Sequence, residues 1–370
     1  MGVFGIAALC AAPVNFREHT IATDLTGGYQ VVPCDVNHDG KIDLIALSSG
    51  MTDLVWFENP TWERHVIASN LHGMINLAAR VIDGDGIPEI VLAHEFSMRA
   101  QDSRGIISLL THNGDPRGLW NIREIDRLPT SHRLRWGNID GEKVLVNATL
   151  IGAHAEAPDY RDRVPLVYYV PGEWKRHIID DSLQGLVHGL TITPDGILTA
   201  GFNGIMRYQL GKDGKWSRTL LTPGDPSPWP KSGSSDVAVG KLGNEKFITA
   251  IEPWHGNQVA VYRAQDSTWQ RKVIDDSLLD GHTILTADLD DDGNDEIIAG
   301  FRGQPQRVYI YSFDGARWNR QTLDDGGVSA AACAVADLNG DGRPDIACIG
   351  SATHNLKWYE NLGPAKSIRQ

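Results

Sequence analysis

A short motif that recurs seven times along the chain constrains the fold more than any other feature of the sequence. Each copy begins with an aromatic residue and continues into basic or polar residues and an apolar run. The copies are FREHTIA (16–22), WERHVIA (62–68), WNIREID (120–126), WKRHIID (174–180), WSRTLLT (216–222), WQRKVID (269–275) and WNRQTLD (318–324). Their aromatic anchors lie 46, 58, 54, 42, 53 and 49 residues apart. Seven units at this spacing are typical of four-stranded propeller blades.

Three further strands are predicted between successive copies of the motif. The first is a small-residue apolar run such as HTILTADL (282–289), and after a Gly-Asp turn the second is a run such as EIIAGF (296–301). The third alternates apolar and polar residues, as in LVWFEN (54–59) and LKWYEN (356–361). Period-two alternation bounded by Gly, Asn and Asp indicates strands, and helical spacing is almost absent. The sequence therefore predicts one all-β domain, a seven-bladed β-propeller with four-stranded antiparallel blades.

The two ends of the chain predict how the ring closes. The seventh unit stops after its third strand, whereas the first begins with an extra fourth-strand motif at residues 16–22. We expect this N-terminal strand to complete the last blade and remove its exposed edge. The propeller then covers residues 16–362, with a C-terminal tail at 363–370. Residues 1–15 resemble the end of a secretory signal without its basic region, which predicts a secreted or periplasmic protein.

Charge and composition exclude several classes of partner. The chain has 34 Lys and Arg against 47 Asp and Glu, a net charge of −13, and no basic cluster. A nucleic-acid-binding surface is therefore not expected, and no apolar run is long enough to span a membrane.

Cys34, Cys333 and Cys348 lie in apolar runs and are predicted to be buried free thiols. His19, His65 and His177 belong to the outer-strand motif and are expected to make structural hydrogen bonds.

Three turns carry the pattern D-x-[DN]-x-D-G-x-x-[DE], in DVNHDGKID (35–43), DLDDDGNDE (288–296) and DLNGDGRPD (337–345). Oxygen ligands at alternate positions wrap a hard cation, and the Gly permits the sharp turn. The pattern therefore predicts two to three structural calcium sites, with an Asp/Gly-rich hairpin without metal as the alternative. The expected ligands are Asp35, Asn37, Asp39 and Asp43; Asp288, Asp290, Asp292 and Glu296; and Asp337, Asn339, Asp341 and Asp345.

These loops, each followed by an apolar strand, resemble the FG-GAP (VCBS-type) repeats of extracellular β-propellers. The run SLLDGHTILTADLDDDGNDEIIAGFRG (277–303) resembles more narrowly the seven-bladed propeller of fungal aldos-2-ulose dehydratase and its bacterial relatives. The chain is also similar, more distantly, to propeller polysaccharide lyases that cleave ulvan or gum arabic. The resemblance implies a carbohydrate substrate and a reaction at the mouth of the propeller channel.

Aligned on the first Asp of these loops, the repeats place a column of residues where each innermost strand begins. The occupants are Tyr29, Ile75, His132, His188, Ser234, His282 and Ala331, and His72 lies three residues before Ile75. The second strand is antiparallel, so its end returns to the same mouth. Residues expected there for catalysis or substrate binding are His94, Glu95, His154, Asn203, Glu252, Trp254, His255 and Arg302. A long insert at 155–165 is expected to form a lid that carries Tyr160, Arg161 and Arg163.

Imidazoles and carboxylates at one mouth favour β-elimination on a keto- or uronate-containing sugar, which needs a base, an acid and stabilisation of the enolate. The predicted catalytic set is His72, His94, Glu95, His132, His188 and His282. Resemblance to the propeller lyases implies that His72 and His94 act as a pair. A divalent metal such as zinc or manganese, held by clustered imidazoles with a Glu such as Glu95, is an alternative charge stabiliser.

Two other interpretations remain open at this stage. The chain is either a carbon–oxygen lyase, a non-catalytic module that binds glycan or protein, or a domain of a larger enzyme. No sequence signature of another common enzyme class appears, because the nucleophile elbow, the phosphate loop, the Rossmann fingerprint and the His-Glu-x-x-His motif are all missing. The sequence does not specify the oligomeric state.

Overall fold

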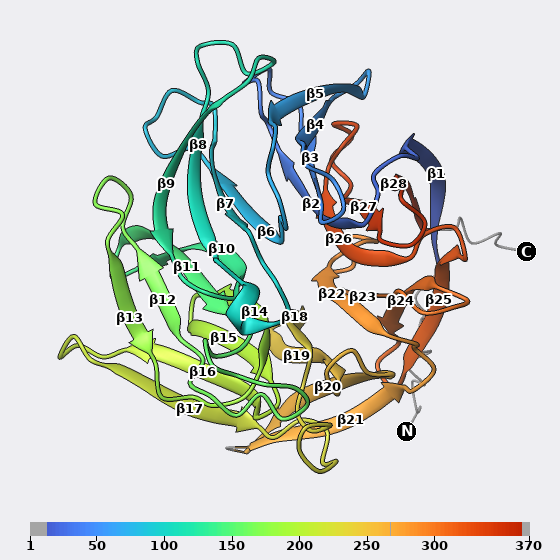
Figure 1. Cartoon of the computed structure of the whole chain (residues 1–370). Helices are drawn as coiled ribbons and strands as arrows, with labels where there is room; N and C mark the ends of the chain where they lie inside the picture. Colours follow the sequence, from blue (N-terminus) through green and yellow to red (C-terminus); the bar gives the residue numbers. More distant parts are fainter. Residues whose placement is uncertain (1–12, 267, 365–370) are drawn as a thin grey trace, which may run out of the picture.

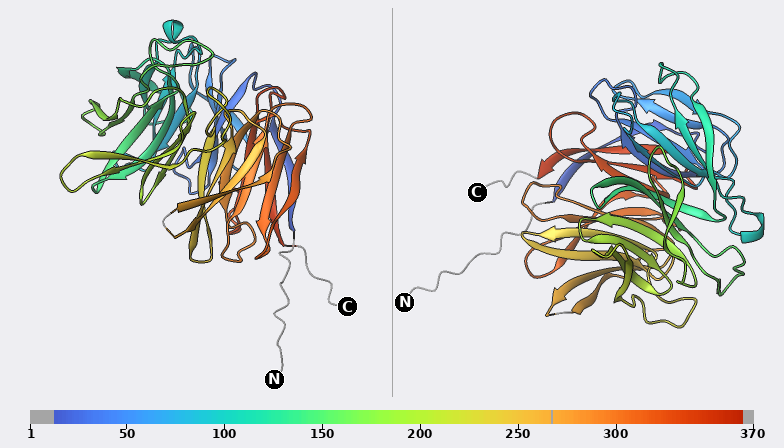
Figure 2. Two further views of the ribbon diagram at one scale, coloured as in Figure 1. Left: turned by 90° about the horizontal axis from the view of Figure 1, so that it is seen from below. Right: turned by 90° about the vertical axis from the view of Figure 1, so that its left-hand side faces the viewer.

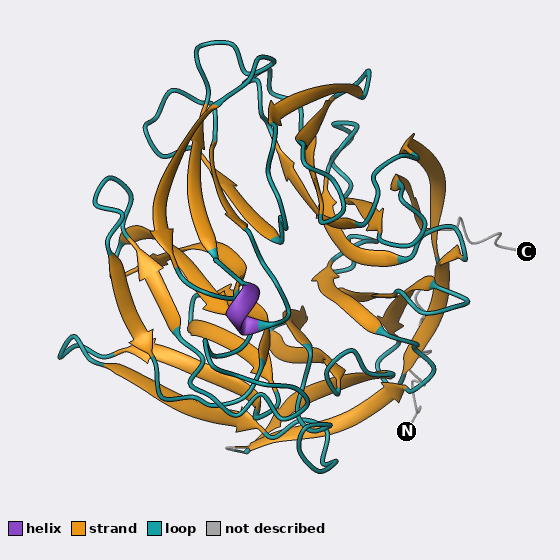
Figure 3. Cartoon of the chain, viewed as in Figure 1, coloured by secondary structure: helices purple, strands orange, loops and turns teal. Residues whose placement is uncertain are grey.

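The computed structural model describes residues 13–266 and 268–364, which form seven four-stranded antiparallel sheets around a central axis (Figure 1). Strands and loops make up nearly all of this region, and its one helix is the short 3-10 turn η1 (Ala100–Asp102) (Figure 3). No helix among these residues is long and apolar enough to cross a membrane. The fold is the seven-bladed propeller that the repeats predict.

Blades I to III each use four consecutive strands, paired in chain order. Blade I contains β2 (Gly28–Cys34), β3 (Asp43–Ser48), β4 (Leu54–Glu58) and β5 (Glu63–Ala68). Blade II contains β6 (Asn76–Arg80), β7 (Glu89–His94), β8 (Ile106–Thr111) and β9 (Asn121–Arg127). Blade III contains β10 (Ser131–Ile139), β11 (Glu142–Thr149), β12 (Leu166–Tyr169) and β13 (Arg176–Asp180).

Blades IV to VI follow the same order. Blade IV contains β14 (Val187–Thr193), β15 (Gly196–Gly201), β16 (Gly204–Leu210) and β17 (Trp216–Thr222). Blade V contains β18 (Asp236–Leu242), β19 (Glu245–Glu252), β20 (Gln258–Gln265) and β21 (Thr268–Asp275). Blade VI contains β22 (Gly281–Ala287), β23 (Glu296–Phe301), β24 (Arg307–Phe313) and β25 (Trp318–Asp325). The first strands of neighbouring blades contact one another, so they surround the axis.

Blade VII combines the two ends of the chain, as the sequence predicts. It contains β26 (Ala330–Ala336), β27 (Asp345–Gly350), β28 (Leu356–Pro364) and β1 (Val14–Ala22). β1 pairs antiparallel with β28 from Val14 opposite Pro364 to Ala22 opposite Leu356, so the first and last described strands lie side by side (Figure 2). These strands extend two residues beyond the predicted propeller limits at each end. Residues 1–12 and 365–370, with most of the predicted leader remnant and tail, lie outside the described residues.

The hydrophobic core lies between neighbouring blades rather than at the axis. Ile45 and Leu47 of β3, for example, pack in one buried cluster with Leu92 of β7. Side chains of successive strand residues face the two neighbouring blades in turn, so each blade is buried on both faces. The first strands and the loops at their ends therefore surround the axis, and polar side chains lie there.

His19 and His65 make the structural hydrogen bonds that their motif predicts, whereas His177 Nε2 is buried without a hydrogen-bond partner in the described part of the chain. The His19 ring stacks on Trp358 with centroids 4.3 Å apart, and its Nε2 lies 2.9 Å from Glu360 Oε2. His65 Nε2 lies 2.9 Å from Glu58 Oε2, and the His177 ring stacks on Tyr168 at 4.8 Å.

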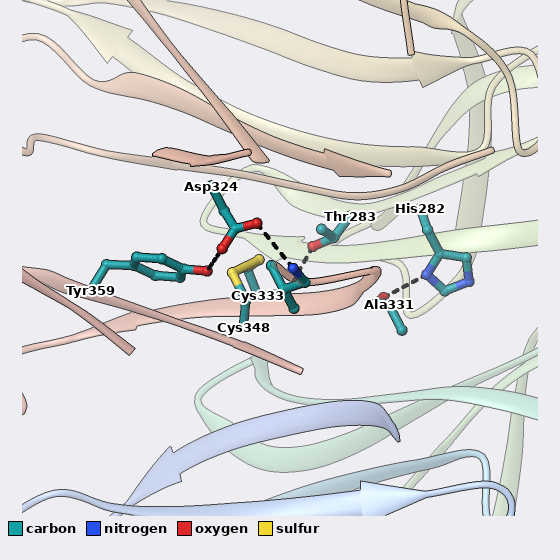
Figure 4. The surroundings of a disulfide bond; sticks show 8 residues. His282, Thr283, Asp324, Ala331, Cys333, Cys348 and Tyr359 are labelled. Carbon is teal, nitrogen blue, oxygen red and sulfur yellow. Dashed lines mark hydrogen bonds between the residues drawn. A yellow bond between two sulfur atoms is a disulfide. The ribbon is translucent and has the colours of Figure 1, made fainter. Parts of the chain in front are cut away.

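The prediction of three free thiols is wrong for two of them. Cys333 of β26 and Cys348 of β27 form a disulfide (Figure 4). The two residues are direct cross-strand partners in the hairpin that carries the last acidic loop, so strand register brings them together despite a sequence separation of 15. Cys34 is free, and burial, followed by the nearby Asp35 and Asp43 carboxylates, raises the pKa of its thiol to about 12.

Candidate active site

A cavity of about 310 Å³ opens where the first strands begin, at one end of the axis. This volume is at the lower end of the roughly 300–1,000 Å³ that is usual for ligand pockets. Its walls combine imidazoles, an arginine and apolar side chains from six of the seven blades. The lining residues are Tyr29, Ile75, Phe96, Met98, His132, Leu150, His188, Trp254, His255, His282 and Arg302.

The predicted histidine column reaches the cavity through β-bulges. In β2, β10, β14, β22 and β26 the pairing with the second strand skips one residue, and the skipped residues are Tyr29, His132, His188, His282 and Ala331. A bulged residue is left out of the ladder, and the strand bends so that its side chain is aimed in a new direction. Four of these five residues, all but Ala331, line the cavity.

Three imidazoles form a nearly equilateral triangle in the cavity wall. They belong to His188 on β14, His255 in the loop after β19, and His282 on β22, and their ring centroids are 5.0, 5.1 and 5.1 Å apart. One ring nitrogen from each lies within 4.8 Å of the other two. His188 and His282 are almost completely buried. We call these three residues the histidine triad.

The outer nitrogen of each triad ring has a polar partner, and in His188 and His282 this partner is a backbone carbonyl that fixes which ring nitrogen carries the proton. His188 Nδ1 donates to the Ser235 carbonyl at 3.1 Å, and His282 Nδ1 donates to the Ala331 carbonyl at 2.5 Å (Figure 4). A carbonyl only accepts, so Nδ1 carries the proton in both rings and Nε2 has the lone pair. In His188 this Nε2 accepts a hydrogen bond from Arg133 at 3.3 Å. His282 Nε2 is buried and has no hydrogen-bond partner in the described part of the chain.

His255 has a carboxylate and a guanidinium beside its Nδ1 instead of a carbonyl, because Arg302 Nη2 lies 3.0 Å from the same nitrogen. Its Nδ1 lies 3.1 Å from Asp280 Oδ1, and Asp280 also accepts two hydrogen bonds from Arg302 at 3.0 Å. Burial alone would raise the pKa of Asp280, but His255 and Arg302 together lower it to about 2. A carboxylate or carbonyl behind each imidazole is the arrangement that orients histidines toward a metal ion.

Burial keeps the triad neutral. It lowers the pKa of His188 and His282 well below the usual value, and the nearby Arg133 and Arg302 respectively lower it further. Burial also lowers the pKa of His255. A neutral imidazole is the form that binds a metal.

A fourth imidazole, His132, lies beside the triad and is linked to Tyr29. The His132 ring is 5.0 Å from that of His188, and its Nε2 accepts the Tyr29 hydroxyl at 2.9 Å. Because Nε2 accepts, Nδ1 carries the proton, and this buried nitrogen has no partner among the described residues. The Tyr29–His132 pair is thus a ready path for a proton at the cavity wall.

A cluster of aromatic side chains lies beside the cavity, and one of its members, Trp254, lines the cavity wall. Trp254 packs at a tilt of 45° against His255 with ring centroids 4.8 Å apart, and its ring centroid lies 5.7 Å from that of Phe202. Tyr160, from the predicted lid, approaches Trp254 at 6.1 Å. Trp229 anchors this loop, since its Nε1 donates to the Asp159 carbonyl at 3.0 Å. We call Tyr160, Phe202, Trp229 and Trp254 the aromatic mouth.

Several residues predicted for the site lie outside the cavity. His72 is exposed in the loop before β6, His94 is turned toward Ser108 of β8 with its Nε2 3.0 Å from Oγ, and Glu95 pairs with Arg104 at 3.6 Å. The structure therefore does not bring the implied His72–His94 pair to the triad.

Three further predicted residues also have other surroundings. His154 is exposed in the lid loop, and Asn203 donates to the Gln184 carbonyl at 2.7 Å. Glu252 is fully buried inside blade V, where it accepts hydrogen bonds from Ser234 at 2.9 Å, from Arg271 at 2.8 Å and from Tyr262.

Sequence reasoning missed two charged residues next to the triad. Arg133 follows His132 directly, and its guanidinium contacts His132 and His188. Asp280 stands two residues before His282 and orients His255. Their closeness to column histidines in sequence was the available signal, although only the structure shows which imidazoles they contact.

The three acidic loops adopt the tight turns that their pattern predicts. The first carboxylate of each accepts backbone N–H groups across its turn, as Asp288 does from Asp292 at 3.1 Å and Gly293 at 3.0 Å. Asp288, Asp290 and Glu296 also bring one oxygen each within 4.8 Å of one another. Burial, and then these aspartates, raise the pKa of Glu296 to about 8. Such crowding is relieved by a bound cation, so calcium remains a prediction that the geometry fits.

Comparison with known proteins agrees with the motifs. The family model of the aldos-2-ulose dehydratase β-propeller domain matches residues 104–265, and that of the FG-GAP-like repeat matches 288–348. The chain is a seven-bladed propeller that resembles the aldos-2-ulose dehydratase propeller. The dehydratase of Phanerodontia chrysosporium is 27% identical over 263 residues, which cover 60% of this chain. The match spans 29% of the length of that relative.

Solved structures with a similar fold are more distant in sequence. A luciferin-regenerating enzyme is 11% identical, with a TM-score of 0.51 over 95% of this chain and 97% of its own. A candidate 6-phosphogluconolactonase from Bacteroides fragilis is 14% identical, with a TM-score of 0.53 over 90% of this chain and 98% of its own. At this identity the two structures support the fold alone.

Proposed function

We propose that the chain is a carbon–oxygen lyase that eliminates water or an alcohol from a carbohydrate bound in the axial cavity. The observation that carries the proposal is the histidine triad, with three inner nitrogens facing one space and each outer nitrogen held in place. Similarity to the propeller of a protein named aldos-2-ulose dehydratase supports the reaction class and a carbohydrate substrate.

A divalent metal such as zinc or manganese fits the triad. The donors are neutral imidazoles, and the unpartnered His282 Nε2 is a buried atom that a metal ligand bond would satisfy. His188, His255 and His282 would hold the ion, leaving further positions open to substrate. When bound, the ion supplies a positive charge that polarises a sugar carbonyl or carboxylate and so stabilises an adjacent enolate.

The chain's own residues provide the proton transfers. In β-elimination a C–H proton next to the carbonyl group is removed, a carbon–carbon double bond forms, and the leaving oxygen departs with a proton. Tyr29 hydrogen-bonds to His132 Nε2, so transfer of the hydroxyl proton to that nitrogen would leave a phenolate oxygen that accepts the substrate C–H proton. The restored Tyr29 hydroxyl would then protonate the leaving oxygen, and His132 would return its proton to Tyr29.

The remaining cavity residues position the groups that react. Asp280 and Arg302 hold the His255 ring, and the half-buried Trp254 ring, which lines the cavity, offers a flat apolar face on which a pyranose ring can stack. A glycan-binding module without catalysis is the second candidate, and the aromatic mouth is the observation that favours it.

We also propose that the protein is exported. The Cys333–Cys348 disulfide supports this, because such bonds persist in oxidising compartments. The acidic loops at 35–43, 288–296 and 337–345 would bind calcium there as structural sites, away from the histidine triad.

Incubation of the protein with keto-sugars and with uronate-containing glycans, followed by enone absorbance, tests the proposal. Removing a proton-transfer group typically lowers the rate by roughly 10²–10⁴-fold, so we expect a loss of that size for Tyr29→Phe and His132→Ala. His177→Gln, in the outer strand β13, is the matched control and should retain the wild-type rate. Binding of a glycan without turnover under any metal condition would favour the second candidate instead.

A further inference from the structure

Two arginine side chains lie inside the channel next to the histidine triad. Arg133 and Arg135 are two residues apart on β10, so they project to the same side of the strand, toward the axis. Both line a second cavity of about 110 Å³, which shares Tyr29 and His282 with the cavity at the mouth. Only 5% of Arg133 is exposed to solvent. The two cavities thus meet at the triad, with guanidinium groups on the inner side.

Neither guanidinium has an ion-pair partner. Arg133 donates to His132 Nε2 at 3.2 Å and to His188 Nε2 at 3.3 Å, and both acceptors are neutral imidazoles. Arg135 donates to Asn76 Oδ1 at 3.1 Å and to the Leu134 carbonyl at 2.8 Å. Within residues 13–266 and 268–364, neither arginine has a carboxylate oxygen within 4.0 Å.

The local charge balance is therefore positive. Asp236 is the one acidic side chain in the lining of the inner cavity, and it accepts the backbone N–H of Val237. One buried guanidinium, that of Arg133, and one half-buried guanidinium, that of Arg135, line the cavity with this single carboxylate. Because a buried charge without a partner is costly, proteins normally pair such groups with an opposite charge. A ligand that carries a negative charge into the channel would supply the missing partner for these guanidinium groups.

A metal ion bound at the triad would increase the need for a negative charge beside Arg133. This step of the inference rests on the proposed function. A metal on His188 Nε2 takes the lone pair that one Arg133 N–H now uses. That N–H then needs a new acceptor, and the ion adds positive charge beside it. A carboxylate satisfies both requirements, because its two oxygens match the fork of a guanidinium and can also face a cation.

We propose that the inner cavity binds the carboxylate of a sugar acid, with Arg133 as the main contact and Arg135 as the deeper one. The sugar ring would lie in the outer cavity under the aromatic mouth, and its carboxylate would point along the axis. In a uronate the proton removed in β-elimination is next to the carboxylate, so neutralising that group makes the proton more acidic. Arg133 is then a specificity-determining residue that selects acidic over neutral sugars.

Isothermal titration calorimetry on the full chain loaded with zinc tests this selection without a variant. The probes are D-galacturonate, its methyl ester and D-galactose, which share one ring and differ at the carboxyl position. Hydrogen bonds to charged groups contribute enough for a preference of about 10- to 100-fold. We expect galacturonate to bind more tightly than either neutral probe by that factor. Equal binding of the acid and its ester would overturn the proposal.

Variants assign the preference to the arginine. Arg133→Gln should lower galacturonate affinity by about 10- to 100-fold and leave galactose affinity unchanged, whereas Arg133→Lys should keep part of the preference. Arg64→Gln, at an exposed ion pair of β5, is the matched control. Galacturonate affinity that survives Arg133→Gln, or sulfate that binds as tightly as galacturonate, would overturn a sugar-acid pocket.

The same samples separate this inference from the proposed function. Galacturonate binding without any enone product would leave the pocket standing and remove the lyase. Conversely, elimination from a neutral keto-sugar, with no preference for acids in binding, would leave the lyase standing and remove the pocket.

Discussion

Glu252 offers a sharp test of how the structure divides site residues from residues that only stabilise the fold. The sequence predicts it for substrate binding, whereas the structure buries it inside blade V. Its carboxylate accepts hydrogen bonds from Ser234, Arg271 and Tyr262. Replacing Glu252 by alanine would leave the Tyr262 hydroxyl and the Arg271 guanidinium without this partner in the blade.

The contacts of the Glu252 carboxylate determine how much stability its substitution should cost. Removing one member of a buried ion pair costs about 3–5 kcal/mol of stability. Because 26% of the Arg271 side chain is exposed, water can solvate part of its charge, and we expect the lower end, about 3 kcal/mol. Glu252→Gln keeps the size and one acceptor oxygen but loses the charge, so it should cost about 1.5–3 kcal/mol.

Urea unfolding followed by tryptophan fluorescence measures these losses. Asp195→Ala, at an ion pair with Lys246 in which both side chains are more than half exposed, is the control and should change stability by at most about 1 kcal/mol. Glu252→Ala and Asp195→Ala with equal unfolding midpoints would refute the reasoning. Loss of turnover in a fully stable Glu252→Gln protein would instead return Glu252 to substrate binding.

Three other elements of the fold give testable predictions. Reduction of Cys333–Cys348, or the double Cys→Ser variant, should lower the free energy of unfolding by about 3 kcal/mol, the value for a loop of about 15 residues. A reductant should have no further effect on the double variant, and an unchanged urea midpoint on reduction would show that the bond is absent. Asp288→Asn and a calcium chelator should each lower the melting temperature, and indifference to both would exclude a calcium site at 288–296. Deletion of Val14–Ala22 should expose the edge of β28 and cause aggregation, so a soluble truncation of normal stability would contradict the closure.

The repeats alone predict the blades, their number and the closing strand. Each of these follows from a local pattern copied seven times, and the copies support one another. Alignment of the copies also finds Tyr29, His132, His188 and His282, because the bulge that aims each of them occurs at the same place in its blade. Because the blades repeat, these four site residues can be predicted from the sequence.

Side-chain direction at the ends of the second strands could not be predicted in the same way. His94 ends β7 and His255 lies just beyond β19, yet only His255 reaches the cavity, while His94 faces Ser108. The direction depends on the strand register and on the loop that follows, and loops differ from blade to blade. The Cys333–Cys348 pair was missed for a related reason, since the pairing depends on the register across the acidic loop.

The central claim is that the histidine triad holds a metal ion that the reaction needs. The most direct measurement adds zinc stepwise to chelator-treated protein while bound metal and enone formation are followed together. We predict that turnover rises in proportion to the zinc bound at the triad, and that His282→Gln neither binds this zinc nor gains activity. Full turnover by the metal-free protein, or equal zinc binding by His282→Gln, would contradict the claim.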